Sequence, residues 1–284
     1  MNKQKNIIVA GKHEKPITVD IYWNDSAQNQ SIVLFAHGFK GFKDWGHWEE
    51  VAKAFVAAGH CFVKFNFSHN GVTPDDLLNF ADLEAFGHNN YIKELDDLQV
   101  VIDWLSTPEG LDKKINWDTN NITLVGHSRG GPIVLIAANE NINVQRVVTW
   151  AGVHELNYPW ANQEEHVENW KKEGVYHIMN GRTKQNMPLY YQLYENYMAN
   201  EARLSIQKTL GKLDKPYLIL HGTKDPAVPL EAAYYLSEHA QNATLVEIEG
   251  ADHVFGGKHP FVDTTLPPHS QKLVDECIEF IQEH

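Results

Sequence analysis

Residues 121–131, Asn-Ile-Thr-Leu-Val-Gly-His-Ser-Arg-Gly-Gly, place a serine between glycines at the end of an apolar run. The run is typical of a buried strand, and the apolar residues 132–138 that follow favour a helix. A Gly-x-Ser-x-Gly sequence at a strand-to-helix junction predicts a tight turn with an exposed serine hydroxyl, because only small residues fit beside it. Ser128 is therefore our candidate nucleophile, and the N–H groups of the helix end would stabilise negative charge developing beside it.

A serine hydroxyl needs a general base, and that base needs a third group to orient it. Two further apolar strands are expected at 216–222 and 243–250. The first is followed by a loop that contains Asp225, and the second by a loop that contains His253. Because a serine, a carboxylate and a histidine at the ends of three strands supply the groups that nucleophilic acyl transfer needs, we predict His253 as the base and Asp225 as its orienting group.

Other titratable residues are weaker candidates. Asp252 is adjacent to His253, and since neighbours in a loop rarely face each other, we expect it to cap the loop or face solvent. Glu249 is interpreted as an exposed edge charge. The chain has 16 histidines, which reduces the significance of any single one. Four of them are set aside by position: His127, His154, His221 and His259.

A strand expected at 31–36 ends in His37-Gly38-Phe39-Lys40-Gly41. A loop at this point of the sheet can supply a second oxyanion donor, and we predict the backbone N–H of Phe39 for that role. Its partner would be the N–H of Arg129, the residue after the nucleophile. Removing one such donor typically costs about 3–4 kcal/mol in transition-state stabilisation. The alternative is that the glycines only shape a turn.

The four motifs His-Gly-Phe-x-Gly, Gly-His-Ser-Arg-Gly-Gly, His-Gly-Thr-Lys-Asp and Gly-Ala-Asp-His resemble those of the serine α/β-hydrolase superfamily. The resemblance covers the chain from about residue 30 onward, and the pattern is similar to bacterial cinnamoyl and feruloyl esterase-like and dienelactone hydrolase-like proteins. It implies Ser128 as nucleophile, His253 as base, Asp225 as orienter, and the N–H groups of Phe39 and Arg129 as oxyanion donors. Uncharged residues are frequent at the position of Arg129, so its side chain either alters the pocket or points away.

The order of elements predicts an α/β fold. Residues 6–23 indicate an antiparallel hairpin, and strands recur near residues 31, 61, 121, 145, 216 and 243. Helical patterns alternate with them at 46–58, 91–106, 132–140, 229–240 and 269–282. This alternation predicts a doubly wound, mostly parallel sheet with its site beyond the carboxyl ends of the strands, and the resemblance implies that the sheet is of the eight-stranded α/β-hydrolase type.

Residues 154–210 form a connection too long for simple alternation, and we predict a helical cap inserted into a core of residues 1–153 and 211–284. The segment is rich in aromatic residues that suit the roof of an apolar pocket, although about half are expected to pack the cap onto the core. Trp160 and Tyr190 are our candidates for substrate contacts, whereas Arg182 and Lys184 are interpreted as solvated charges. The aromatic residues are Tyr158, Trp160, Trp170, Tyr176, Tyr190, Tyr191, Tyr194 and Tyr197. The loop 70–90 is expected to form another wall, with acidic residues that cap helices or bind the cap.

Composition limits the class of protein further. The chain of 284 residues carries 24 Lys and Arg against 37 Asp and Glu, a formal charge of −13 that disfavours nucleic acid and anionic membranes as partners. No signal peptide, membrane span, zinc-ligand spacing or glycine-rich phosphate loop is recognisable, so we expect a cytoplasmic enzyme without metal or cofactor. The two cysteines are expected to stay reduced. A homodimer is compatible with this composition.

The predicted reaction is hydrolysis of a small carboxylic ester through an acyl-enzyme on Ser128, with an apolar or aromatic substrate. Amides, thioesters and transfer to another acceptor use the same groups, so peptidase, thioesterase and acyltransferase activities stay open. A hypothesis of a different class is a ligand-binding protein that retains the fold without catalysis.

Overall fold

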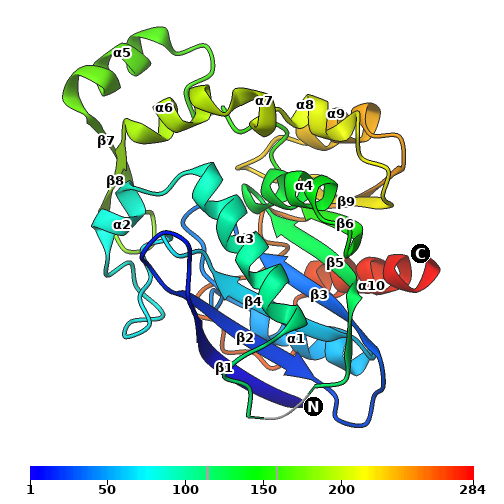
Figure 1. The fold of residues 1–284 in the computed structure, drawn as a ribbon. Helices are drawn as coiled ribbons and strands as arrows, with labels where there is room; N and C mark the ends of the chain where they lie inside the picture. The colour runs from blue at the N-terminus through cyan, green and yellow to red at the C-terminus, as the bar shows by residue number, and fades with distance from the viewer. Residues whose placement is uncertain (113–114, 158) are drawn as a thin grey trace.

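The computed structural model describes residues 1–112, 115–157 and 159–284. Its centre is an eight-stranded sheet with the strand order β1-β2-β4-β3-β5-β6-β9-β10 (Figure 1). β2 pairs antiparallel with β1 and β4, and the neighbours from β4 to β10 pair in parallel. The strands are β1 (Asn2–Val9), β2 (Ile17–Trp23), β3 (Gln30–Ala36), β4 (Cys61–Asn66), β5 (Trp117–His127), β6 (Val144–Trp150), β9 (Tyr217–Gly222) and β10 (Ala243–Ile248). The mostly parallel sheet and its N-terminal hairpin are as predicted.

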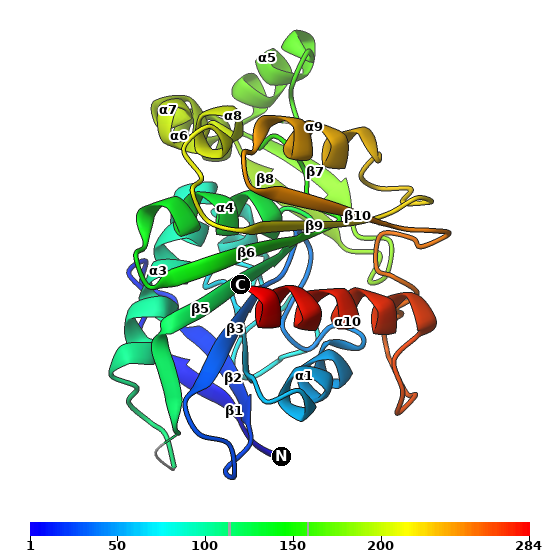
Figure 2. The same ribbon diagram turned by 90° about the vertical axis from the view of Figure 1, so that its right-hand side faces the viewer.

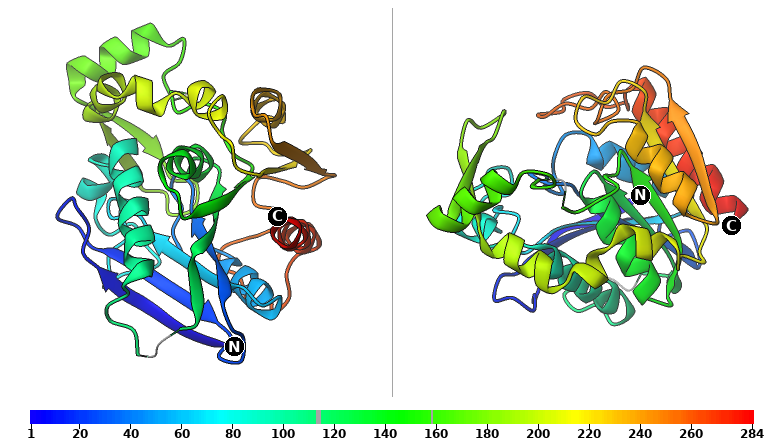
Figure 3. Two further views of the ribbon diagram at one scale, coloured as in Figure 1. Left: turned by 45° about the vertical axis from the view of Figure 1, so that its right-hand side comes forward. Right: turned by 90° about the horizontal axis from the view of Figure 1, so that it is seen from above.

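Helices cover both faces of the sheet (Figures 2 and 3). One face carries α3 (Tyr91–Ser106), α4 (Gly130–Glu140) and α9 (Glu231–His239), and the other carries α1 (Trp48–Ala57) and α10 (Pro268–Glu283). Each layer encloses its own apolar core. The central strands are therefore buried on both faces, which explains why their sequences are continuous apolar runs rather than alternating patterns.

The cap segment, residues 154–210, connects β6 to β9. Its described part contains α5 (Glu164–Glu173), β7 (Val175–Met179), β8 (Asn186–Tyr190), α6 (Gln192–Ala199), α7 (Glu201–Leu204) and α8 (Ile206–Leu210). The expectation of a purely helical insertion was incomplete, because β7 and β8 pair as an antiparallel hairpin. Tyr158, one of the aromatic residues noted in the sequence, lies outside the described residues.

The loop 70–90 contacts the cap segment, but it does not form the expected wall of the site, because none of its residues lines the cavity that contains Ser128 and His253. It contains the short helix α2 (Leu83–Gly87), beside which β8 lies (Figure 1). Asp82 caps this helix by accepting a hydrogen bond from the Ala85 N–H at 2.9 Å, and Glu84 accepts one from the Tyr190 hydroxyl at 2.6 Å. The acidic residues of this loop therefore do cap a helix and bind the cap.

Cys61 and Cys277 are both buried and unbridged. Among the described residues, the helices all fall short of the length and apolarity needed to cross a membrane.

Candidate active site

Ser128 lies at the junction between β5 and α4. Its backbone has a positive φ of 55°, a left-handed conformation that non-glycine residues adopt rarely and mostly in strained turns. A Cβ atom at Gly126 would lie 2.3 Å from the Gly130 carbonyl oxygen, and one at Gly130 would lie 2.5 Å from the Ala36 carbonyl oxygen. Both glycines are therefore required by close backbone approach. The turn has the geometry of a nucleophile elbow, and Ser128 is partly exposed while both of its neighbours are buried.

The structure brings Asp225 and His253 together. His253 Nδ1 lies 2.7 Å from Asp225 Oδ2, and the Asp225 side chain is fully buried. Asp225 Oδ1 accepts hydrogen bonds from the N–H groups of Ala227 and Val228 at 2.7 and 2.9 Å. Burial alone would raise the pKa of Asp225, but the hydrogen bonds from His253 and these two amides hold it below its usual value. Asp225 is thus an ionised acceptor that orients the imidazole and leaves Nε2 available as a base.

The loops that carry these two residues are joined to each other. The N–H of Lys224 donates to the Ala251 carbonyl at 3.0 Å, and the N–H of Thr223 donates to the Ile248 carbonyl at 3.1 Å. The Thr223 hydroxyl in turn accepts from the Gly250 N–H at 2.8 Å. These contacts follow from the parallel pairing of β9 and β10, which places their carboxyl ends side by side.

The weaker candidates from the sequence lie in other contacts. Asp252 Oδ1 accepts hydrogen bonds from the N–H groups of Val254 and Gly256, so it caps its loop as expected. Glu249 is exposed in the turn after β10. His259 accepts from the Gly46 N–H through Nδ1, and the His154 ring packs against Tyr235.

Two other histidines contact the His253–Asp225 pair. His127 Nε2 donates to the His253 carbonyl at 2.8 Å, and the two rings lie 4.7 Å apart. Burial and the nearby His253 lower the pKa of His127 to about 3, so its ring stays neutral. His221 is fully buried, donates through Nε2 to the Val228 carbonyl at 2.9 Å, and lies 3.5 Å from Asp225 Oδ2. Both residues therefore contact the His253–Asp225 pair, which leaves them a positioning role if His253 is the base.

Ser128 and His253 share the wall of one cavity of about 170 Å³. A space of this size admits a small acyl or alcohol group. A larger depression of about 560 Å³ lies next to Asp44 and Glu49, but neither Ser128 nor His253 lines it. The smaller cavity is lined by His37, Gly38, Phe39, Lys40, Gly41, Trp45, Trp48, His127, Ser128, His253 and Val254.

The loop that follows β3 (residues 37–44), here called the oxyanion loop after the role predicted for Phe39, runs directly past Ser128. A Cβ atom at Gly38 would lie 2.8 Å from the Ser128 Cβ, so this close approach requires glycine. The next residue, Phe39, lines the same cavity as Ser128. The turn is closed by a hydrogen bond of 3.0 Å from the Gly41 N–H to the Gly38 carbonyl.

The side chain of Arg129 points away from the cavity into a buried network. Its guanidinium forms a salt bridge of 2.5 Å with Glu94 and lies 4.4 Å from the centre of the Phe39 ring. Glu94 also accepts a hydrogen bond from Asn89 at 2.8 Å. Of the two alternatives for this residue, the structure thus favours an orientation away from the pocket. The pair connects the residue after the nucleophile to α3.

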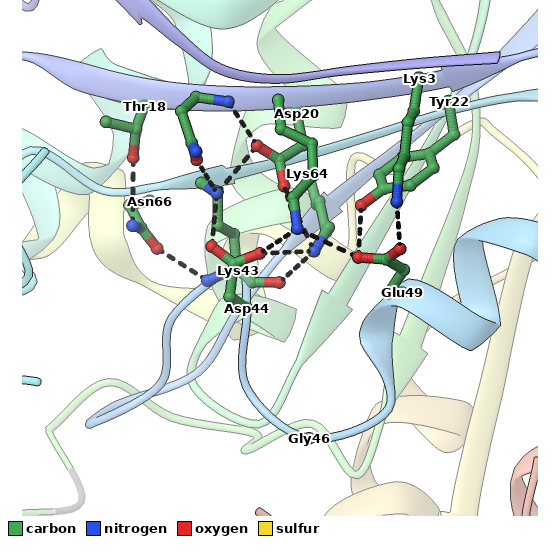
Figure 4. Close-up of polar contacts among 12 residues, drawn as sticks. Lys3, Thr18, Asp20, Tyr22, Lys43, Asp44, Gly46, Glu49, Lys64 and Asn66 are labelled. Carbon is green, nitrogen blue, oxygen red and sulfur yellow. Dashed lines mark hydrogen bonds and ion pairs between the residues drawn. The ribbon is translucent and has the colours of Figure 1, made fainter. Parts of the chain in front are cut away.

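A buried ionic cluster holds the oxyanion loop against β2 and β4 (Figure 4). Its members are Asp20, Lys43, Asp44 and Lys64. Lys43 Nζ lies 2.8 Å from Asp20 Oδ1, and Lys64 Nζ donates to the Lys43 carbonyl at 2.8 Å. Burial alone would raise the pKa of Asp44, but the ammonium groups of Lys64 and Lys43 hold it well below its usual range. Two buried cations thus face two carboxylates, and the loop is fixed to β2 and β4.

The structure corrects the two predicted substrate contacts. Trp160 is buried and its ring lies among those of Tyr91, Trp170, Tyr194 and Tyr197, so it packs the cap segment onto the core. Tyr190 packs against the His88 ring and donates its hydroxyl to Glu84. Neither residue lines the cavity shared by Ser128 and His253. Buried aromatic residues mostly serve packing, and the sequence alone does not show which ring faces which side.

Sequence reasoning missed the aromatic walls of the cavity. Trp45 follows the oxyanion loop and Trp48 begins α1, and both line the cavity together with Phe39. The Trp48 ring packs 5.6 Å from the His127 ring. The sequence did offer one indication, because Trp45 and Trp48 follow the His37-Gly38 motif within a few residues.

The fold and site define an α/β-hydrolase-type protein, and comparison with known proteins agrees. Residues 33–264 match the family described as "Alpha/beta hydrolase family". The chain belongs to the alpha/beta hydrolase family.

Individual relatives are distant. The chain is 22% identical over 253 residues to a monoglyceride lipase homolog of Monkeypox virus, covering 82% of this chain and 84% of the relative. Est1E from Butyrivibrio proteoclasticus, solved with bound ferulic acid, is similar with a TM-score of 0.72 and 19% identity, covering 98% of both chains. Dienelactone hydrolase from Anabaena variabilis gives a TM-score of 0.63 and 18% identity, covering 99% of this chain and 98% of that one. At these identities the solved structures establish the fold.

Proposed function

We propose that this protein is a serine esterase that hydrolyses small carboxylic esters through an acyl-enzyme on Ser128. The observation that carries the proposal is the hydrogen bond of 2.7 Å between His253 and the buried Asp225, on a histidine that shares one cavity with the elbow serine. The relatives also support an ester as the substrate, since they include a monoglyceride lipase homolog and Est1E, which was solved with ferulic acid.

The mechanism follows from the positions of these groups. His253 Nε2 takes the proton of Ser128 as Oγ attacks the ester carbonyl, and the N–H groups of Phe39 and Arg129 stabilise the oxyanion. His253 then protonates the departing alcohol, which leaves the acyl group on Ser128. Water enters, gives a proton to His253 and attacks the acyl carbonyl, and His253 then returns that proton to Ser128 Oγ as the acid leaves.

The cavity supports a preference for small substrates. Its volume of about 170 Å³ and its three aromatic residues, Phe39, Trp45 and Trp48, favour a short acyl chain or a small ring. We therefore expect rates on 4-nitrophenyl esters to be highest for acetate to butyrate and to fall for longer chains.

The test is the hydrolysis of this ester series by the wild type and by Ser128→Ala. The expected result is a loss of turnover of about 10⁴-fold or more in the variant, with an unchanged circular dichroism spectrum. Turnover that persists in Ser128→Ala would contradict the proposal. A folded wild type that leaves esters intact but binds them would favour the ligand-binding alternative, and preference for an amide, thioester or second acceptor would favour a peptidase, thioesterase or acyltransferase.

Three further expectations from the sequence stay predictions: a cytoplasmic location, a homodimeric assembly and a small-molecule substrate as the main partner. Subcellular fractionation and analytical ultracentrifugation test the first two directly.

A further inference from the structure

The wall of the catalytic cavity carries an unusual cation. Lys40 lines the same cavity as Ser128 and His253, although the protein as a whole has a formal charge of −13. In the described part of the chain, the cavity wall contains no Asp or Glu side chain. Among the described residues, Lys40 is thus the charged side chain on this wall, while the buried Asp225 carboxylate bonds to His253 and does not line the cavity.

The backbone of Lys40 is held in place. Its φ of 57° lies in the left-handed region, inside the turn closed by Gly38 and Gly41. Three residues further on, the buried ionic cluster fixes Lys43 to β2 and β4. The position of the Lys40 Cβ is thus determined by the same loop that carries Phe39, and the side chain starts at a defined point beside the nucleophile.

The ammonium group of Lys40 differs in its surroundings from those of Lys43 in this loop and Lys64 on β4. Lys43 and Lys64 each face two carboxylates, whereas no Asp or Glu of residues 1–112, 115–157 or 159–284 forms a salt bridge with Lys40. Its Nζ lies 5.6 Å from the centre of the Phe39 ring, and partial burial lowers the pKa of Lys40. A partly buried ammonium without a counter-charge is destabilised relative to water, and an incoming anion would remove that penalty.

We infer that Lys40 binds a carboxylate of the substrate, so that the ester hydrolysed at Ser128 is an acidic one. This rests on the proposed function and narrows its substrate class to small esters that carry a carboxylate a few bonds from the scissile carbonyl. Lys40 supplies a charge-assisted hydrogen bond to that carboxylate, and Ser128 attacks the ester carbonyl held beside it.

The test compares matched pairs of esters that differ in one charge. On the acyl side the pair is the 4-nitrophenyl monoester of glutarate and 4-nitrophenyl valerate, and on the alcohol side it is 4-acetoxybenzoate and 4-methylphenyl acetate. The measured quantity is the ratio of kcat/KM for the acidic ester to that for the neutral ester. Using both pairs shows on which side of the ester bond the carboxylate is bound.

The variants are Lys40→Met, Lys40→Arg and Lys184→Met. Lys184 is a matched control, because it is exposed, has a φ of 59° and lies outside the cavity, and its replacement changes the net charge equally. Lys40→Met is expected to lower the acidic-to-neutral ratio about tenfold or more in one pair. Lys40→Arg should restore most of the ratio, and Lys184→Met should leave it at the wild-type value.

Equal ratios in the wild type and Lys40→Met for both pairs would overturn the inference. A failure of the proposed function is recognised separately, as the absence of any Ser128-dependent hydrolysis of the neutral esters. In that case calorimetric titration of glutarate into Ser128→Ala and into Ser128→Ala with Lys40→Met decides the binding role. Weaker binding in the double variant supports it, and equal binding overturns it.

Discussion

The guanidinium of Arg129 lies 4.4 Å from the centre of the Phe39 ring. These two residues are the proposed oxyanion donors through their backbone N–H groups, so a contact between their side chains connects the two halves of the oxyanion hole. Glu94 completes the arrangement by pairing with Arg129 from α3. Donors that are fixed before the reaction do not have to reorganise when charge develops.

Glu94→Gln removes the counter-charge of a buried guanidinium. We expect a loss of about 3 kcal/mol or more in the free energy of unfolding, because removing one partner of a buried ion pair is costly. We also expect a lower kcat with a nearly unchanged KM, because the oxyanion donors lose their fixed geometry. Urea denaturation and steady-state kinetics measure the two effects. Glu140→Gln is the control, since its pair with Arg203 is exposed and should contribute below about 1 kcal/mol. Similar effects of both substitutions would contradict this interpretation.

Asp225→Asn tests which acidic residue orients the base. An amide at this position supports the wrong tautomer of His253, so kcat should fall by about 10⁴-fold while the protein stays folded. Asp252→Asn is a matched control, because Asp252 is adjacent to His253 but caps the loop through backbone N–H groups. It should reduce kcat by less than about tenfold. A larger loss in Asp252→Asn than in Asp225→Asn would reverse the assignment.

Lys43→Met tests the anchoring of the oxyanion loop. The substitution leaves Asp20 and Asp44 with fewer cations in a buried setting, and we expect the free energy of unfolding to fall by about 3–5 kcal/mol. Lys3→Met removes a cation from the exposed pair with Glu49 and should cost below about 1 kcal/mol. Chemical denaturation of both variants at low salt gives the comparison, and a difference close to zero would argue against the anchoring role.

We expect the buried carboxyl group of Asp97 to make the free energy of unfolding depend on pH. Burial raises its pKa to about 7 in the folded protein, with Glu94 and Asp96 nearby, although the Ser68 N–H bonds to its Oδ2. The folded state therefore holds this proton up to about pH 7, whereas an unfolded Asp releases it near its model value of 3.8. The contribution of the Asp97 proton to the free energy of unfolding is complete below about pH 4 and is lost as the pH rises through about 7.

Asp97→Asn should accordingly be close to the wild type in the free energy of unfolding at pH 4, near the unfolded pKa, where the contribution of the Asp97 proton is almost complete. At pH 8 it should be more stable than the wild type by about 2–4 kcal/mol, since the buried charge is absent. Calorimetric unfolding at the two pH values gives this difference. If the variant and the wild type differ in free energy of unfolding by the same amount at both pH values, Asp97 does not titrate in this range.

Much of the catalytic geometry was predictable because its signals are local. Ser128 is flanked by glycines at a strand-to-helix junction, and Asp225 and His253 follow apolar strands directly. Parallel strands bring their carboxyl ends to one edge, so the sequence order already predicts proximity. The roles of the individual residues in catalysis stay predictions until they are measured.

Other features depend on contacts between distant segments. The pairing of Arg129 with Glu94 joins residues 35 positions apart on different elements, and no local pattern indicates it. The β7–β8 hairpin was missed because β7 is largely exposed and β8 contains Pro188, which weakens a strand pattern. Trp160 was assigned to the substrate because aromatic composition does not distinguish a ring that packs the cap from one that faces the cavity.

Covalent labelling tests the central claim most directly. The wild type is treated with a fluorophosphonate, its mass is measured intact, and the modified peptide is identified by tandem mass spectrometry. We predict a single adduct on Ser128, absent from Ser128→Ala and strongly slowed in His253→Ala, with esterase activity lost in proportion to labelling. An adduct on another serine, or ester turnover that survives complete modification of Ser128, would contradict the account.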